Sequence, residues 1–177
     1  MLPIRFGTVA PGDEEVLELL RSSYSQLLSE INRMQGKVEV GLKVFWKKEA
    51  VLQEVNSKID KIKKIKEAGD EKKSYKAMLE LGQVIQQVTE YWKEKYLPLI
   101  VKRLEVYSEE SKLNDPFGVE MLFNLAFLVQ ESKRKEFEEE LEKIAQKYQE
   151  MFIFRYVAPV SPYNFANLRI NMNWERK

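Results

Sequence analysis

Apolar residues recur at every second position in four segments of the chain. The clearest alternation runs through 38–46, at Val38, Val40, Leu42, Val44 and Trp46. Segments 2–9, 119–129 and 152–156 show the same period of two, and 119–129 is apolar on both of its faces. Strict alternation is typical of a strand with one buried face, and a run that is apolar on both sides is typical of a central strand. The sequence therefore predicts four strands.

Helical spacing fills the intervals between these strands. Residues 16–34 and 133–149 carry apolar positions three or four apart, which predicts two amphipathic helices. Two longer segments, 47–68 and 71–111, are joined by Gly69-Asp70, a natural helix–helix turn, and predict an antiparallel hairpin. We expect Pro98 to kink or break the second helix near Leu97.

The second hairpin segment also carries a stripe at heptad spacing: Met78, Leu81, Ile85, Val88 and Trp92. Such a stripe is most simply the inner seam of the hairpin, and the alternative is a docking stripe for a partner helix.

Together these elements predict an α+β fold. The order is β-α-β, hairpin, β-α-β, and two right-handed βαβ units can interleave into a four-stranded ferredoxin-like sheet. We expect a sheet domain over 1–46 and 116–158. A coiled-coil-like helical hairpin over 47–113 would be inserted between the second and third strands, and an irregular tail would cover 159–177.

Composition removes several classes of function. The chain has no cysteine and no histidine, which excludes disulfides, thiolate or imidazole catalysis and the common zinc sites. Lys and Arg number 29 against 28 Asp and Glu, so there is no overall basic excess of the kind that polyanion binders show. The sequence shows neither a signal peptide nor an apolar run of membrane-spanning length. We expect a soluble, cytoplasmic protein that needs no cofactor or metal.

Two local features remain as candidates for binding. Residues 58–76 hold eight lysines and four acidic residues, which fits either a solvated hairpin tip or contact with an anionic partner. The tail is too apolar for a simple disordered end, because it contains Pro159, Pro162, Tyr163, Phe165, Leu168, Ile170 and Trp174. It would either cover its own sheet or recruit a partner.

Four ordered segments resemble the GvpF/GvpL family of gas vesicle proteins. The first two are Leu2-Pro3-Ile4-Arg5-Phe6-Gly7-Thr8-Val9 and Gly36-Lys37-Val38-Glu39-Val40-Gly41-Leu42-Lys43-Val44. The others are Asn124-Leu125-Ala126-Phe127-Leu128-Val129 and Ala158-Pro159-Val160-Ser161-Pro162-Tyr163-Asn164-Phe165. Val160 and Ser161 depart from the family's tail signature, which has Trp and Pro there. The family's usual N-terminal portion precedes the first segment, so we expect a chain that lacks it, as a trimmed version, through a start site assigned too late, or as a naturally short member.

The resemblance implies a non-enzymatic accessory role in building gas vesicles. The chain would act as an adaptor or chaperone that binds the apolar shell protein and other gas vesicle proteins, because unassembled shell subunits aggregate unless escorted. Under this hypothesis Tyr163 and Phe165 are apolar anchors, and Pro159 and Pro162 stiffen the tail. Arg5 is a further candidate contact, with a surface ion pair as the alternative.

Two other hypotheses stay open. A ferredoxin-like sheet with a basic hairpin tip could bind nucleic acid, although the strands lack the aromatic motif of RNA-binding sheets. The other remaining hypothesis is an enzyme that uses carboxylates or lysines.

Overall fold

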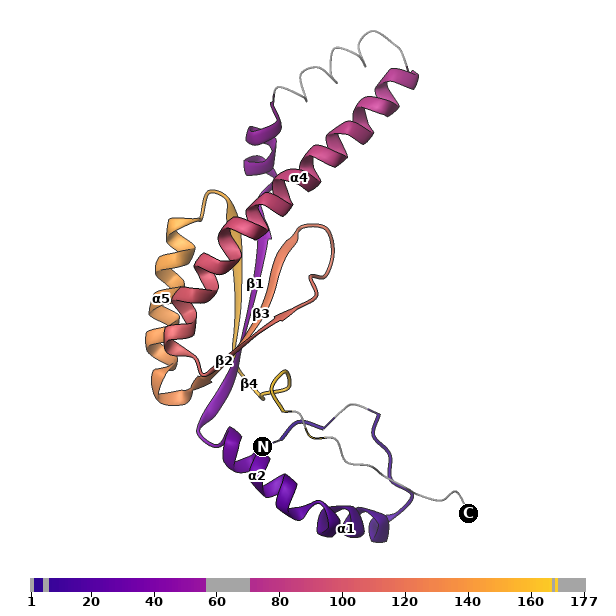
Figure 1. Ribbon diagram of the computed structural model, residues 1–177, viewed down its shortest axis with the longest axis vertical. Helices are drawn as coiled ribbons and strands as arrows, with labels where there is room; N and C mark the ends of the chain where they lie inside the picture. The colour runs from indigo at the N-terminus through magenta and orange to yellow at the C-terminus, as the bar shows by residue number, and fades with distance from the viewer. Residues whose placement is uncertain (1, 5–6, 57–70, 167, 169–177) are drawn as a thin grey trace.

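The computed structural model describes residues 2–4, 7–56, 71–166 and 168, except the side chains of 71–74. Its elements are α1 (Asp13–Ser22), α2 (Tyr24–Met34), β1 (Lys37–Trp46), α4 (Glu71–Leu104), η1 (Glu105–Tyr107), β2 (Glu110–Asn114), β3 (Met121–Gln130), η2 (Glu131–Lys133), α5 (Arg134–Lys147) and β4 (Phe152–Val160). Residues 48–56 are helical as well. The sheet lies in the middle of an elongated molecule, with α4 reaching towards one end and α1 and α2 at the other (Figure 1).

The four strands form one antiparallel sheet in the order β2-β3-β1-β4. β1 is central, because β3 pairs with one of its edges and β4 with the other. Its register places Leu42 opposite Leu125 of β3 and opposite Tyr156 of β4. Since residues opposite each other share a face, the alternation in β1 sends one apolar row to a single side of the sheet.

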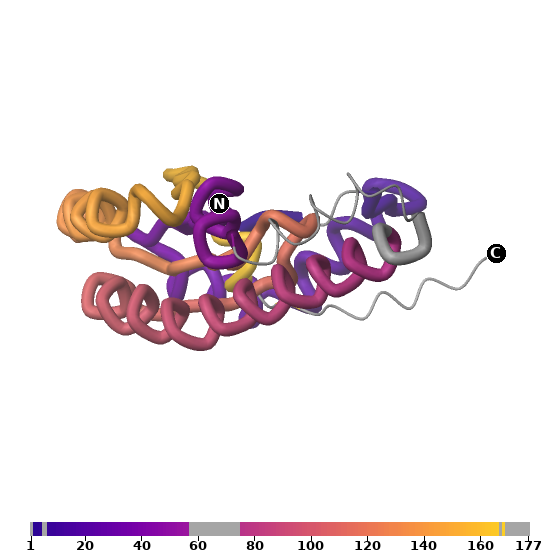
Figure 2. The backbone as a smooth tube through the Cα atoms, turned by 90° about the horizontal axis from the view of Figure 1, so that it is seen from above, coloured from indigo at the N-terminus to yellow at the C-terminus, as the bar shows by residue number. Residues whose placement is uncertain are grey.

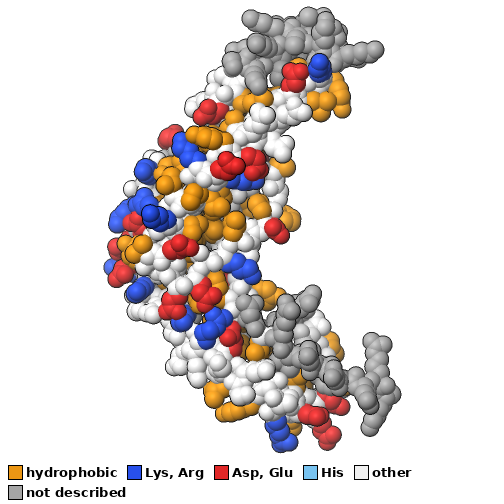
Figure 3. Space-filling view, viewed as in Figure 1, with side chains coloured by type: hydrophobic (Ala, Val, Ile, Leu, Met, Phe, Trp, Pro, Cys, Tyr) orange, Lys and Arg blue, Asp and Glu red, His pale blue; other side chains and the backbone are white. Residues whose placement is uncertain are grey.

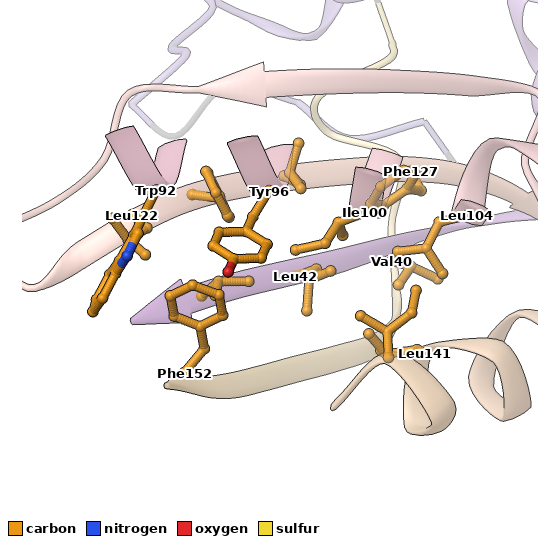
Figure 4. Packing of buried hydrophobic residues seen from close by; sticks show 14 of the residues in the cluster. Val40, Leu42, Trp92, Tyr96, Ile100, Leu104, Leu122, Phe127, Leu141 and Phe152 are labelled. Carbon is orange, nitrogen blue, oxygen red and sulfur yellow. The ribbon is translucent and has the colours of Figure 1, made fainter. Parts of the chain in front are cut away.

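That side is covered by α4 and α5, whose ends lie next to each other in the view along the molecule (Figure 2). Trp92, Tyr96, Ile100 and Leu104 point from α4 onto the strands (Figure 4). The ring of Phe152 in β4 meets those of Trp92 and Tyr96 edge to face, at centroid distances of 5.5 and 5.1 Å. This layer is the main hydrophobic core. The strands predicted within 38–46, 119–129 and 152–156 and the helix predicted at 133–149 all bury apolar residues in it, and these four predictions are confirmed.

The predicted break at Pro98 is wrong. α4 continues through Pro98 to Leu104. A proline in a helix interior removes one hydrogen bond and costs about 3 kcal/mol. Tyr96, Ile100 and Leu104 on either side of Pro98 are all buried against the sheet, and their packing holds the helix together.

The strand expected over 2–9 is not present among the described residues 2–4 and 7–10. Both edges of β1 are already occupied, so no edge of this central strand is left for it. Leu2 packs instead at the margin of a small cluster on the far face of the sheet. The fourth strand is β2, at 110–114, where the sequence predicted the end of the hairpin. The sheet therefore has four strands, as expected, but β2 takes the place of the strand predicted over 2–9.

The N-terminal helical segment and the hairpin differ from expectation in detail. The helix expected over 16–34 is split at Ser23 into α1 and α2. Val51 and Val55, in the helix of 48–56, are buried, and Ile85 and Val88 pack against the main core. Met78 of the heptad stripe is exposed. The predicted turn at Gly69-Asp70 lies outside the described residues, as does most of the basic cluster.

Candidate interaction surface

The face of the sheet opposite α4 and α5 is partly covered by the segment that follows β4. The contact centres on Glu39, which is only 5% exposed although it lies on the polar side of β1. Its two carboxylate oxygens accept hydrogen bonds from Asn164, one from the backbone N–H at 2.7 Å and one from Nδ2 at 2.6 Å. A buried carboxylate needs such partners, so the pair fixes where the segment crosses the sheet.

Apolar packing holds the same segment beside this pair. Phe165 is 3% exposed and forms a small cluster with Met34 of α2 and with Ala126 and Leu128 of β3. Pro162 is buried too, and its carbonyl accepts the backbone N–H groups of Phe165 and Ala166 at 3.3 and 2.9 Å. The chain thus makes a tight turn that delivers Phe165 to the sheet.

Arg33 joins α2, β2 and this segment. Its guanidinium donates to Glu30 at 2.8 and 3.0 Å, to Glu110 of β2 at 2.5 Å and to the carbonyl of Phe165 at 2.5 Å. The hydrogen bonds to Glu30 are the main reason why the pKa of Arg33 lies above its ordinary value. Lys112 of β2 adds a hydrogen bond to the carbonyl of Asn164 at 3.2 Å. Polar contacts from two elements therefore hold the segment in place.

The structure separates the residues that the sequence analysis grouped as partner contacts. Phe165 and Pro162 are buried under their own fold. Tyr163 is 59% exposed, and Pro159 is an exposed residue of β4, so only these two offer their side chains to solvent. Arg5 lies outside the described residues. The sequence left two possibilities for the tail, covering its own sheet or recruiting a partner. Pro162 and Phe165 follow the first, because both are buried against the sheet.

An apolar stripe that no other described part of the chain covers runs along α1 and α2. Its five members recur three or four residues apart, and each is between 43% and 65% exposed: Leu17, Leu20, Tyr24, Leu28 and Ile31. The stripe is nearly continuous across the helix boundary, because Ser23 accepts from the N–H of Leu27 and donates to the carbonyl of Leu19. Soluble proteins rarely leave so regular an apolar face open, and such faces mark interaction sites.

A second apolar surface lies between α4 and the edge strand β2. It is a shallow groove of about 270 Å³ lined by Leu97, Pro98, Val101, Ser111, Leu113 and Leu125. Figure 3 shows hydrophobic side chains gathered in the middle of this view, where α4 passes over the sheet. The groove adds to the apolar surface, but it carries no group with evident chemistry.

The titratable side chains of Tyr156 and Glu138 join two elements of the fold. Burial, and then the carboxylate of Glu138, raises the pKa of the Tyr156 hydroxyl, which donates to Glu138 at 2.7 Å and so joins β4 to α5. No cluster of three or more acidic side chains suited to a metal ion occurs among the residues described. None of the helices described is long and apolar enough to cross a lipid bilayer.

Sequence reasoning missed the residues that position the segment. Glu39 and Lys43 both alternate to the polar side of β1, and nothing in the pattern says that one is buried and the other exposed. Asn164 reads as a loop residue between Tyr163 and Phe165. The stripe of α1 and α2 did have a signal, namely its helical period, but the period indicates a buried face just as well as an exposed one.

Comparisons with known proteins place this geometry in a family. The family model of gas vesicle synthesis protein GvpL/GvpF matches residues 1–167. Gas vesicle protein F from Dolichospermum flosaquae is 30% identical over 170 residues, covering 95% of this chain and 69% of the relative. The crystal structure of GvpF from Anabaena sp. PCC7120 matches with a TM-score of 0.72 at 28% identity, over 95% of this chain and 70% of the other. That of GvpF from Microcystis aeruginosa gives a TM-score of 0.70 at 28% identity, over 94% and 70%. The chain belongs to the GvpL/GvpF family.

Proposed function

We propose that this gas vesicle accessory protein is an assembly adaptor or chaperone that binds the apolar shell protein. Membership of the GvpL/GvpF family supports the link to gas vesicles. The observation that carries the adaptor role is the exposed stripe on α1 and α2. A subunit whose apolar surface is exposed before assembly needs a complementary apolar surface to prevent aggregation. We place this activity in the cytoplasm and on the growing vesicle, together with other accessory proteins.

The C-terminal segment extends the proposed surface. Phe165 contacts Met34 at the end of α2, so the segment lies against the end of the helix that carries part of the stripe. Tyr163 and Pro159 would contact the partner, while Pro162 and Phe165 hold the segment against the sheet. Arg5 stays a predicted contact. This division of roles refines the expectation that both aromatic residues act as anchors.

Co-purification tests the proposal. The tagged chain is co-expressed with the shell protein, as wild type and as the double variant L20E/L28E, which places two charges in the stripe. The matched control is L79E/L99E, which puts the same charges at exposed apolar positions of α4. We expect the wild type and the control to retain the shell protein, and L20E/L28E to lose most of it. Tyr163→Ala should give a smaller loss.

Two results would overturn the proposal. One is full retention of the shell protein by L20E/L28E while circular dichroism shows that the variant is folded. The other is a folded wild-type chain that retains no shell protein.

We also propose a description of the domains that modifies the one expected from the sequence. The connection order β1-α4-β2-β3-α5-β4 and the sheet order support a ferredoxin-like core. Residues 1–46 and 110–160, together with the half of α4 that covers the sheet, would form the sheet domain, and the remaining helical part of 47–104 would project from it as the inserted hairpin. Residues 161–177 would form the tail. Limited proteolysis tests this description, because cleavage should begin in the hairpin and leave the sheet domain associated.

A further inference from the structure

Beyond the C-terminal segment, the same face of the sheet presents an open area with an unusual charge pattern. Cross-strand partners form rows on it: Gly41 opposite Val157, Lys43 opposite Arg155, and Phe45 opposite Ile153. Four of these side chains are exposed: Lys43, Ile153, Arg155 and Val157. We call these six residues the open face. It lies away from α4 and α5, whose contacts use the alternate residues of β1 and β4.

The two cations of the open face have no acidic partner among the residues that the structure describes. Like charges directly opposite each other on neighbouring strands destabilise a sheet, because their Cβ atoms are only about 5 Å apart. The neighbour of Lys43 on the other strand is Asn124, whose amide donates to the carbonyl of Asp115 at 3.0 Å. Within the described part of the chain, no carboxylate lies within ion-pair distance of Lys43 or Arg155. The ring of Phe45, whose centroid lies 5.0 Å from the Arg155 guanidinium, partly offsets the charge of Arg155.

We infer that the open face binds an acidic amphipathic helix of a partner protein. Carboxylates of that helix would lie between Lys43 and Arg155 and relieve their repulsion, while its apolar residues would cover Ile153 and Val157. Gly41 leaves one end of the open face without a side chain on β1, so a helix can approach the backbone there. The open face is separate from the stripe on α1 and α2, so the inference does not depend on binding of the shell protein.

The composition of the open face favours a peptide over a nucleic acid. Sheets that bind single-stranded RNA stack bases on aromatic residues of their central strands. Here the positions of β3 that share the face with Lys43 and Gly41 are Asn124 and Ala126. The single aromatic ring, Phe45, is already stacked with Arg155. Aliphatic side chains and two cations match the apolar and acidic sides of an amphipathic helix.

Titration of the full chain with synthetic peptides tests the inference by NMR. The probe is an acidic amphipathic peptide of Glu, Ala and Leu, about four helical turns long. One comparison peptide replaces every Leu with Ser, a second replaces every Glu with Lys, and poly(U) RNA is the third comparison. We expect the acidic peptide alone to shift the amide signals of 41–45 and 153–157, with dissociation constants at least about tenfold tighter than those of the comparisons.

Variants separate a specific face from general attraction by positive charge. Lys43→Glu with Arg155→Glu should weaken binding of the acidic peptide at least about tenfold. The control K102E/K135E makes the same charge change on exposed positions of α4 and α5, and it should leave the affinity unchanged. Gly41→Val keeps both cations and should also weaken binding by obstructing the face, and its added Cβ would meet Val157 at ordinary contact distances. Equal affinity of K43E/R155E and wild type, or tighter binding of poly(U) at the same amides, would overturn the inference.

Discussion

The two faces of the sheet are built from the same strands but are covered in different ways. On one face, β1 contributes Val40, Leu42 and Val44, all inaccessible to solvent, and two helices cover them. On the other face, β1 contributes Glu39, Gly41 and Lys43. One buried acid there holds a returning segment of chain, and the remaining area is open. The sheet therefore has one face covered by helices and one covered only in part, by the C-terminal segment.

This difference assigns neighbouring positions of single strands to different tasks. Alternation sends neighbouring residues of β1 to opposite faces, so we expect a substitution at one position to disturb the main core and a substitution at the next to disturb the C-terminal segment or the proposed contacts. The helix-covered face is held by hydrophobic packing, so a cavity there should lower the free energy of unfolding of the whole domain by a large amount. The other face depends on a few hydrogen bonds and one aromatic ring, whose loss releases only the segment that they hold.

The largest effect is expected in the helix-covered core. Phe127 is inaccessible to solvent, and its ring centroid lies 5.2 Å from that of Phe137 in α5. Phe127→Ala should lower the free energy of unfolding by about 3–5 kcal/mol, because it leaves a cavity in a packed layer. Ile153→Ala, on the open face, should cost less than about 1 kcal/mol. Urea denaturation measures both, and equal losses would show that the two faces contribute alike.

A smaller effect is expected where the C-terminal segment covers the sheet. Phe165→Ala should cost about 2 kcal/mol, less than a central core position, because the loss cannot exceed the free energy that holds the segment in place. Hydrogen exchange should accelerate in 161–166 while the amides of β1 and β3 stay protected. The neighbouring exposed residue gives the control, since Tyr163→Ala should change the stability by less than about 0.5 kcal/mol. Global loss of protection in Phe165→Ala would contradict the local role.

Removing the hydrogen bonds between Glu39 and Asn164 should lower the stability by a smaller amount. Glu39→Gln replaces one charged acceptor oxygen by an amide, and we expect a loss of about 1–2 kcal/mol. Asn164→Ala should cost a similar amount. If the two residues act through each other, the double variant should cost little more than the larger single change in a double-mutant cycle. Additive losses would mean that Glu39 is stabilised by other groups.

The smallest effect is a pH dependence at the same end of the sheet. Lys37 forms an ion pair with Glu109, and Gln130 donates to Glu109 at 2.7 Å. The hydrogen bond from Lys37 is the main reason why the pKa of Glu109 lies below its usual value. The contribution of the ion pair is therefore complete at neutral pH and is lost as the pH falls through that lowered pKa.

Since Glu109 is about one-third exposed, Glu109→Gln should cost less than about 1 kcal/mol at pH 7. The difference from wild type should begin to shrink as the pH falls below about 4 and should vanish once the pH is below the lowered pKa of Glu109. Denaturation curves over this range check the prediction, and a difference that grows as the pH falls would contradict it.

The sequence predicted those parts of the fold whose periodicity has one physical cause. β1, β3 and β4 alternate because each buries one face or both, and α5 has a helical period because it covers the sheet. β2 shows no such pattern, because a short edge strand is mostly exposed. The segment at 2–9 does alternate, but forming a strand also requires a free partner edge, and periodicity cannot show whether one exists.

The candidate surface was less predictable for a related reason. Tyr163 and Phe165 are both aromatic and lie two residues apart, yet one is exposed and the other buried. The difference comes from the turn at Pro162 and from Met34, Ala126 and Leu128, which come from distant parts of the chain. The exposure of the stripe on α1 and α2 was equally hidden, since a sequence period shows that a face is apolar but not whether something covers it.

Hydrogen exchange of the chain, alone and mixed with the shell protein, compares the two faces in one experiment. We predict that the partner slows exchange in α1, α2 and 161–166, and leaves the amides of α5 and the buried half of α4 unchanged. Protection concentrated on α5 would contradict the proposal that the partner contacts α1, α2 and 161–166. So would demonstrable binding that leaves exchange in α1 and α2 unaltered.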